Sequence, residues 1–276
     1  MLMQVAEVLR PQTPSEAAQL LRRPGVRALA GGSELTAGGP EWETTAVVDL
    51  SGLGLNQIDV GPDGWRLGAM VTLAALEQEP SLAALPGNLL RRSAHHCAPR
   101  TLRNAATLGG VLVGSKAGAE LATALLALGA RVEVYNPQPM RLPLADVLAR
   151  RAELFPGALL TALFLAPPAV AARGGLVRVA RTPADLAVAC AAAVVEVRGD
   201  RIQEARLAVG GLAPVPALLG GAVGLAGQAW ESAAVARVAD EAAALASVDD
   251  IRGSAEYRRW IAPVLVRRAL EEARGA

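Results

Sequence analysis

Two pairs of adjacent glycines are the residues of this chain whose type and spacing best suit chemistry. Gly31-Gly32 follows a strand-like run at 26–30, and Gly109-Gly110 closely follows Thr107. Glycine has no Cβ, so its backbone turns tightly and can bring its N–H group close to a ligand. Successive N–H groups form a concave nest that suits phosphate oxygens. A lone Gly-Gly after a strand is most often a simple turn, but two such loops together predict a grip on one pyrophosphate from two sides.

The composition is that of a soluble protein with a large core. The chain has 276 residues, enough for two domains, and 52% of them are apolar, which excludes wholesale disorder. A net charge of +1 argues against a nucleic-acid binder, which would need a basic face. The apolar runs at 121–130, 158–172 and 184–197 are too short for a spanning helix, and we see no secretory signal. We therefore expect a cytoplasmic protein without a membrane span.

Other polar residues do not predict a catalytic or metal site. Neither Cys97 nor Cys190 has a CxxC partner, so we do not expect an iron–sulfur cluster or structural zinc held by this chain alone. His95-His96 are adjacent and would point about 100° apart on a helix, so we interpret them as a helix end. Cys190 lies in an apolar run typical of core. We interpret Asp249-Asp250 as a helix-start and ion-pair feature.

Hydrophobic periodicity and turn signals place the glycine pairs among short strands and helices. Thr13, Pro14 and Glu16 are typical of a capped helix start and predict a helix to about Arg23. Strands are predicted at 26–30, 45–50, 130–135 and 159–165, and hairpins around 61–64 and 198–201. Further helices are predicted at 72–78, 82–96, 120–128, 215–226, 230–246 and 254–273.

Strands followed by helices over the last hundred residues favour a separate α+β domain. A cluster of Pro, Ala and Gly at 167–175 indicates its boundary. We therefore expect three parts, at 1–57, 58–172 and 173–276. No G-x-G-x-x-G opens a helix after a strand, which argues against a Rossmann dinucleotide site. No acid–base pair indicates a stand-alone flavin oxidoreductase with its own substrate pocket.

Five blocks of sequence, in order, carry a resemblance to one known family. They are Leu-Ala-Gly-Gly-Ser-Glu-Leu at 29–35, Val-Val-Asp-Leu-Ser at 47–51, Leu-Gly-Ala-Met-Val-Thr-Leu at 67–73, Leu-Arg-Asn-Ala-Ala-Thr-Leu-Gly-Gly at 102–110, and a closing signature at 250–258 and 264–270. The first four are similar to L-A-G-G-T-D-L, V-V-D-L-S, I-G-A-x-x-T-x and I-R-N-x-A-T-I-G-G. The chain thus resembles the FAD-binding (medium) subunit of the molybdenum hydroxylases, the family of xanthine dehydrogenase and aerobic carbon monoxide dehydrogenase.

The resemblance implies a fold and a role. The fold would be VAO/PCMH-like, with two α+β FAD-binding subdomains at 1–57 and 58–172 and a C-terminal α+β domain at 173–276 with an antiparallel sheet and helices. The subunit would hold FAD and collect electrons from [2Fe–2S] clusters on a small subunit. A molybdopterin-binding large subunit would carry out the substrate chemistry, and NAD, a quinone or oxygen would accept the electrons. The resemblance implies a flavin-dependent oxidoreductase subunit without a catalytic acid or base.

Carried over residue by residue, the resemblance implies a set of FAD-binding residues. They are Ala28, Leu29, Ala30, Gly31, Gly32, Ser33, Glu34 and Leu35 in the first loop, Thr107, Leu108, Gly109, Gly110 and Val111 in the second, and Glu120 and Leu160 beyond them. Leu160 falls where the family strand touches the isoalloxazine ring. Glu34 is an unusual neighbour for a pyrophosphate because like charges repel. Backbone donors can still bind the phosphates if its side chain points away.

The sequence departs from the family after the second glycine pair. Where the family continues N-x-x-x-x-x-P-x-S-D, this chain has Val111, Ala117, Ala119 and Glu120, and Val177, with Arg178 beside it, stands where a basic residue is common. Each lost polar contact weakens binding by about 0.5–1.5 kcal/mol, so three would lower FAD affinity by about one to three decades. The alternative hypothesis is therefore a non-flavin assembly subunit that retains the fold but has lost tight FAD binding.

Overall fold

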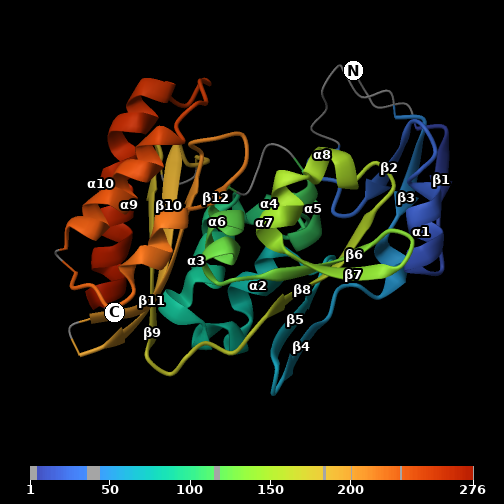
Figure 1. The fold of residues 1–276 in the computed structure, drawn as a ribbon. Coiled ribbons are helices and arrows are strands. Elements are labelled where there is room, and N and C mark those ends of the chain that lie inside the picture. The colour runs from blue at the N-terminus through green and yellow to red at the C-terminus, as the bar shows by residue number, and fades with distance from the viewer. Residues whose placement is uncertain are drawn as a thin grey trace. The chain divides into compact units, whose positions relative to one another are not determined.

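The computed structural model describes residues 5–35, 44–114, 119–182, 185–199, 201–230 and 232–275. Its helices and strands confirm the α+β class expected from the sequence (Figure 1). The chain forms two compact units whose segments alternate along the sequence. The first unit takes 1–75, 100–117 and 131–166, and the second takes 76–99, 118–130 and 167–276. No described helix is both long and apolar enough to cross a membrane.

A parallel three-stranded sheet opens the first unit. Its strands, in order across the sheet, are β1 (Glu7–Leu9), β3 (Ala46–Asp49) and β2 (Val26–Leu29). Helix α1 (Pro14–Leu20) shares a core with this sheet. Thr13 caps α1 as predicted, because its Oγ1 accepts the Glu16 amide at 3.2 Å. The chain leaves β2 directly into the loop that carries the first glycine pair.

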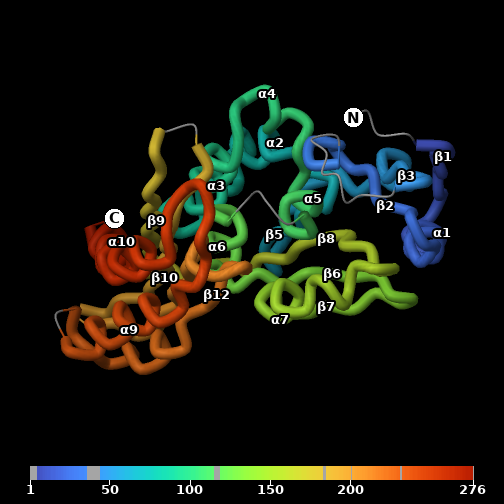
Figure 2. The backbone as a smooth tube through the Cα atoms, turned by 90° about the horizontal axis from the view of Figure 1, so that it is seen from above, coloured from blue at the N-terminus to red at the C-terminus, as the bar shows by residue number. Residues whose placement is uncertain are grey.

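An antiparallel five-stranded sheet forms the rest of the first unit. Its strands, in order, are β4 (Ile58–Gly61), β5 (Gly64–Gly68), β8 (Leu159–Leu165), β6 (Arg131–Tyr135) and β7 (Pro139–Pro143). The hairpin predicted around 61–64 is confirmed as β4–β5. Strand β8 is central and almost fully buried. The helices of this region are α4 (Arg100–Arg103), α5 (Leu108–Val113), α7 (Leu144–Ala149) and α8 (Arg151–Leu154), and α7 lies against β6 and β7 (Figure 2).

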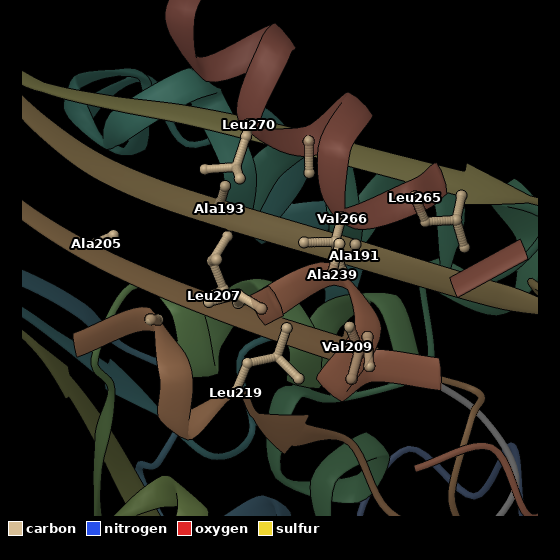
Figure 3. Packing of buried hydrophobic residues seen from close by; sticks show 14 of the residues in the cluster. Ala191, Ala193, Ala205, Leu207, Val209, Leu219, Ala239, Leu265, Val266 and Leu270 are labelled. Carbon is tan, nitrogen blue, oxygen red and sulfur yellow. The ribbon is translucent and has the colours of Figure 1, made fainter. Parts of the chain in front are cut away.

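The second unit is an antiparallel sheet with helices on both faces (Figure 1). Its strands, in order, are β12 (Ala217–Leu218), β11 (Arg201–Gly210), β10 (Ala189–Arg198) and β9 (Ala172–Val179). Its principal helices are α9 (Ala233–Ala244), α10 (Ala255–Gly275), α6 (Ala119–Ala127) and α3 (Leu89–His96). Alternate residues of β10 face α10, where Ala191 and Ala193 pack with Leu265, Val266 and Leu270 (Figure 3). On the other face Cys190 lies 3.5 Å from Thr123 of α6, so it is core as predicted.

Two predicted helices differ from the structure. The expected helix at 215–226 is wrong: the chain there forms β12 and the 3₁₀ helix η4 (Gly220–Leu225), because Pro216 and three glycines disfavour an α-helix. The expected helix at 82–96 begins as 3₁₀ turns. The remaining short elements are α2 (Leu73–Gln78), η1 (Ser51–Leu53), η2 (Pro80–Ala84) and η3 (Pro86–Asn88). The domain boundaries at 57 and 172 stay a prediction, since the second unit also takes the segments with α3 and α6.

Candidate functional site

The two glycine-bearing segments lie against each other within the first unit. A Cβ placed on Gly31 would lie 1.6 Å from the carbonyl oxygen of Ala105, two residues before Thr107. Only glycine therefore permits this contact between backbones. Gly32 next to it has φ of 71°, in the left-handed region that glycine tolerates. Gly31 and Ala105, which are 74 positions apart in the sequence, are thus brought together by backbone contact.

The second glycine pair is not in a loop, which corrects the expectation from the sequence. Gly109 and Gly110 form the first turn of helix α5, and Thr107 is its N-cap. The Thr107 hydroxyl accepts the Gly110 amide at 3.1 Å. The Leu108 and Gly109 amides donate to the carbonyls of Val71 and Ala69, each at 2.8 Å. These amides therefore hold α5 in place and do not form an open nest.

The central strand β8 positions this helix. The Ala69 amide donates to the Thr161 carbonyl at 2.9 Å, which ties the segment after β5 to β8. A Cβ on Gly109 would approach that of Ala69 to 2.9 Å, so the glycine lets α5 pack closely there. Leu160, the preceding residue of β8, is 4% exposed and pairs with Val134 of β6. Leu160, the residue predicted to touch the isoalloxazine ring, therefore lies in the same sheet that supports α5.

Three main-chain N–H groups of these segments have no partner among the described residues. They belong to Gly31, Ser33 and Thr107, whereas the neighbouring amides of Leu108 to Val111 all donate within the protein. Residues 29–34 are half-buried and Ala28 is exposed, so the first loop is accessible. Unpaired backbone donors at an accessible loop suit an anion. The chemistry of these donors thus fits a pyrophosphate.

The acidic side chain of the first loop points to the far end of α5. A Cβ on Gly114, which ends α5, would lie 1.8 Å from Glu34 Oε2. Gly114 is about 10 Å along the helix axis from Thr107, since each residue advances the helix by about 1.5 Å. Arg151 donates to the Gly114 carbonyl at 2.8 Å and places a cation at this end. The carboxylate is therefore held well away from the Thr107 amide.

Val111 and Leu35 supply no polar side chain to the two segments. Val111 is 8% exposed and belongs to the buried side of α5. Leu35, which closes the first loop, is 9% exposed and also apolar. Ala117 lies outside the described residues. The loss of the amide contact expected at Val111 is thus not offset by a polar side chain at that position.

Glu120 is a buried carboxylate with one oxygen unused. It belongs to α6 in the second unit and is 1% exposed. Its Oε1 accepts Arg178 Nε at 3.2 Å and the Ala187 amide at 3.1 Å. Its Oε2 is buried without a hydrogen-bond partner. A buried acceptor without a partner is costly, so this oxygen is suited to a hydrogen-bond donor that is not part of the chain.

The basic residue next to Glu120 was only partly identified from the sequence. Val177 packs against the hydrophobic core of the second unit. Side chains of adjacent strand residues point to opposite faces, so Arg178 lies on the other face and pairs with Glu120. It also donates to the Asp185 carbonyl. The alternation along β9 was the signal that could have assigned the basic position to Arg178.

The cysteines and histidines do not form a reactive centre. Burial raises the pKa of Cys97 well above its usual range and that of Cys190 to about 12, so both thiols stay protonated at neutral pH. His95 Nδ1 lies 2.7 Å from Glu77 Oε1. Within the part of the chain that the structure describes, no group of three or more His, Cys, Asp or Glu could hold a metal ion.

Known proteins are similar to this chain in both sequence and fold. Residues 3–168 match the FAD binding domain in molybdopterin dehydrogenase, and residues 177–273 match the CO dehydrogenase flavoprotein C-terminal domain. The nicotine 6-hydroxylase medium subunit of Paenarthrobacter nicotinovorans is 32% identical over 242 residues, covering 84% of this chain and 83% of that protein. The carbon monoxide dehydrogenase medium chain of Afipia carboxidovorans is 31% identical over 281 aligned positions, covering 96% of this chain and 95% of that protein.

A solved structure extends the likeness to the whole fold. Reconstituted CO dehydrogenase from Oligotropha carboxidovorans matches with a TM-score of 0.88 and 26% identity, covering 100% of this chain and 99% of that one. The fold class expected from the sequence is thereby confirmed, and FAD is the cofactor that the matched domain binds. Because two family models together match most of its length, and a relative is similar over nearly all of it, this chain belongs to the family of FAD-binding medium subunits of the molybdenum hydroxylases.

Proposed function

We propose that this chain is the electron-transfer subunit of a complex with a [2Fe–2S] small subunit and a molybdopterin-binding large subunit. Its flavin would receive electrons from the iron–sulfur clusters and pass them to NAD, a quinone or oxygen. Support comes from relatives that are medium subunits of a nicotine hydroxylase and of a carbon monoxide dehydrogenase. The observation that carries the proposal is the Gly31–Ala105 backbone contact, which joins the two FAD-binding segments.

The residues of the first unit divide the work of holding FAD. The unpaired amides of Gly31, Ser33 and Thr107 would bind the pyrophosphate, and Leu160 would support the isoalloxazine ring. FAD, when bound, supplies a ring that takes up and releases one or two electrons. The residues of the protein would position the FAD and exclude water from it. No acid–base pair is part of this arrangement. The remaining residues of the first loop, 28–35, and of the start of α5, 107–111, would surround these donors.

Glu120 belongs to the set of FAD-binding residues that the family resemblance implies, and it lies in the second unit. Its Oε2 is an unused buried acceptor, and Arg178 compensates the charge of the carboxylate. We propose it as an FAD-binding residue on the family resemblance alone. Val111, Ala117 and Ala119 offer no polar side chain, so we expect FAD affinity below that of a chain with the full family motif.

A FAD titration of the purified full-length chain tests the proposal. We expect visible flavin absorption bands in the purified protein or saturable, one-to-one quenching of FAD fluorescence on reconstitution. Absence of both would overturn the flavin role and favour the assembly-subunit alternative. The matched control is riboflavin, which has the ring but no pyrophosphate. If riboflavin binds as tightly as FAD, the amides of the two segments do not hold a diphosphate.

Co-expression with the two other subunits tests the partner assignment separately. We expect one complex that contains iron, molybdenum and FAD, and reduction of the flavin when the substrate of the large subunit is added. A complex without FAD would support the assembly-subunit alternative. A chain that binds FAD but does not associate with either subunit would refute the partner assignment alone. We also propose a cytoplasmic location and domain boundaries near 57 and 172.

A further inference from the structure

The central strand β8 carries an extra residue directly after Leu160. Ala162 of β8 pairs with Glu133 of β6. The next pair along the two strands is Leu160 with Val134, so Thr161 has no partner residue on β6. One extra residue on one strand of an antiparallel pair is a β-bulge, and bulges are common beside active sites, where they redirect a side chain. This bulge therefore decides in which direction Leu160 points.

The bulge places Leu160 on the buried face of the sheet. Opposed residues of an antiparallel pair share a face, and the face alternates along each strand. Val134 shares its face with Val132, which pairs with Leu163. These three side chains are fully buried, whereas Leu160 keeps 4% of its surface exposed. Without the extra residue Leu160 would share the other face with Ala162, because a shift of one residue moves a strand's side chains across the sheet.

The hydroxyl of Thr161 anchors the bulge. It donates to Glu133 Oε1 at 2.9 Å and lies 3.3 Å from the main-chain oxygen of Glu133. The other carboxylate oxygen lies 3.6 Å from Arg141 Nε, and the Arg141 guanidinium lies 3.8 Å from the centre of the Phe164 ring. Thr161 is buried, while the Glu133 side chain is partly exposed. One buried hydroxyl thus fixes the bulge to a carboxylate that is itself held in place.

The other edge of β8 is regular at the same residue and leads to α5. The Ala69 amide donates to the Thr161 carbonyl at 2.9 Å, and the Ala69 carbonyl accepts the Gly109 amide at 2.8 Å. Gly109 lies in the first turn of α5, close to Thr107, whose amide has no partner among the described residues. The bulge therefore lies between the residue expected at the flavin ring and the helix expected at the pyrophosphate.

We propose that Thr161 is a positioning residue for the flavin ring, a role that rests on the proposed binding of FAD. Thr161 acts through Leu160 and does not contact FAD itself. Its hydroxyl holds the bulge, and the bulge directs the Leu160 side chain toward the isoalloxazine ring and away from the polar face that carries Glu133 and Arg141. A ring that rests on an apolar side chain is shielded from water on that side.

Thr161→Val in the full-length protein tests this role, because the change removes the hydroxyl and keeps the branched shape. We expect FAD to bind about two- to tenfold more weakly, since the loosened bulge passes on at most the free energy of one hydrogen bond. The visible absorption band of the bound flavin should change in shape, because the surroundings of the ring change. ADP, which has the diphosphate without the ring, should compete with FAD with the same affinity as in wild-type protein.

Thr161→Ser is the matched control, since it keeps the hydroxyl and loses only a methyl group, and it should restore the wild-type affinity and flavin spectrum. Glu133→Ala removes the acceptor instead of the donor and should change the spectrum as Thr161→Val does, even if the valine variant does not fold. A wild-type spectrum and affinity in Thr161→Val or Glu133→Ala would overturn the positioning role. An equal loss in Thr161→Ser, or an equal loss of ADP affinity, would show a general loosening of the site and would overturn it too.

The two proposals fail in different ways. If the wild-type chain binds no FAD, the proposed function fails and the role of Thr161 fails with it. If the wild-type chain binds FAD and the removal of the hydroxyl leaves the flavin spectrum and affinity unchanged, only the positioning role is refuted.

Discussion

The contact between the two FAD-binding segments can be broken by a single methyl group. In Gly31→Ala the new Cβ would start 1.6 Å from the Ala105 carbonyl oxygen, while real contacts of this kind are not shorter than 3.0 Å. The two segments would have to separate by about 1.4 Å, the difference between those distances. The three atoms nearest to this Cβ, from Ala105 and Ala106, all belong to the backbone, so no side chain can rotate away to relieve the overlap.

The separation should cost both stability and FAD affinity. Overpacking of this kind destabilises by about 1–3 kcal/mol. Because the Gly31 and Thr107 amides would no longer face the same phosphates, we expect FAD affinity to fall by about ten- to hundredfold, at 1.4 kcal/mol for each factor of ten. The assays are a fluorescence titration with FAD and urea unfolding of the FAD-free protein, performed on the same preparations.

Gly52→Ala is the matched control. Gly52 lies in the same unit, its φ is not in the left-handed region, and a Cβ there would meet nothing within 4 Å. We expect wild-type FAD affinity and wild-type stability from it. If Gly31→Ala also keeps the wild-type dissociation constant, the close approach of the two segments does not matter for FAD, and the reasoning from their contact is refuted.

Three further predictions concern charge and burial in the second unit. Burial raises the pKa of Asp250, but hydrogen bonds from Arg252 and Arg258 outweigh it and hold that pKa well below its usual range. Its stabilisation is therefore present at neutral pH and lost as the pH falls below about 4; Asp250→Asn should lower the free energy of unfolding at pH 7 by about 1–3 kcal/mol, because buried Arg258 loses its charged partner, and an unchanged urea midpoint would contradict this. Arg178→Met should cost about 3–5 kcal/mol in urea unfolding because it leaves the Glu120 carboxylate buried and unpaired, and Glu120→Gln in the same chain should restore part of the loss, so additive losses would refute the pairing. Cys97 and Cys190 should not react with a thiol reagent at pH 8 until the protein is unfolded, because burial raises both thiol pKa values; fast labelling of native protein would show that they are accessible.

Local signals predicted much of the fold. The capped start of α1 was predicted because Thr13, Pro14 and Glu16 act on one another over a few residues. Strand β8 was predicted with its observed bounds because seven residues of mostly apolar character form an unbroken run. The hairpin β10–β11 followed from a turn signal between two apolar runs. In each case the information lay within about a dozen residues.

The parts that could not be predicted depend on distant residues. Two adjacent glycines argue against a helix, yet α5 forms because Thr107 caps it and the Val71 and Ala69 carbonyls accept its first amides. The direction of the Glu34 side chain depends on the end of α5, some eighty residues away in the sequence. The family resemblance supplied the location of the FAD-binding segments, but not which of their amides remain unpaired.

The interleaving of the two units along the chain limits how the protein can be divided. A cut near residue 167 would yield an N-terminal piece that keeps α3 and α6 without the sheet they cover, and a C-terminal piece whose β10 has one face bare. Each piece would expose apolar surface to water and aggregate. Genetic fusion, splitting or domain exchange in this family should therefore keep residues 5–275 together, even though two different family models match the two parts of the chain.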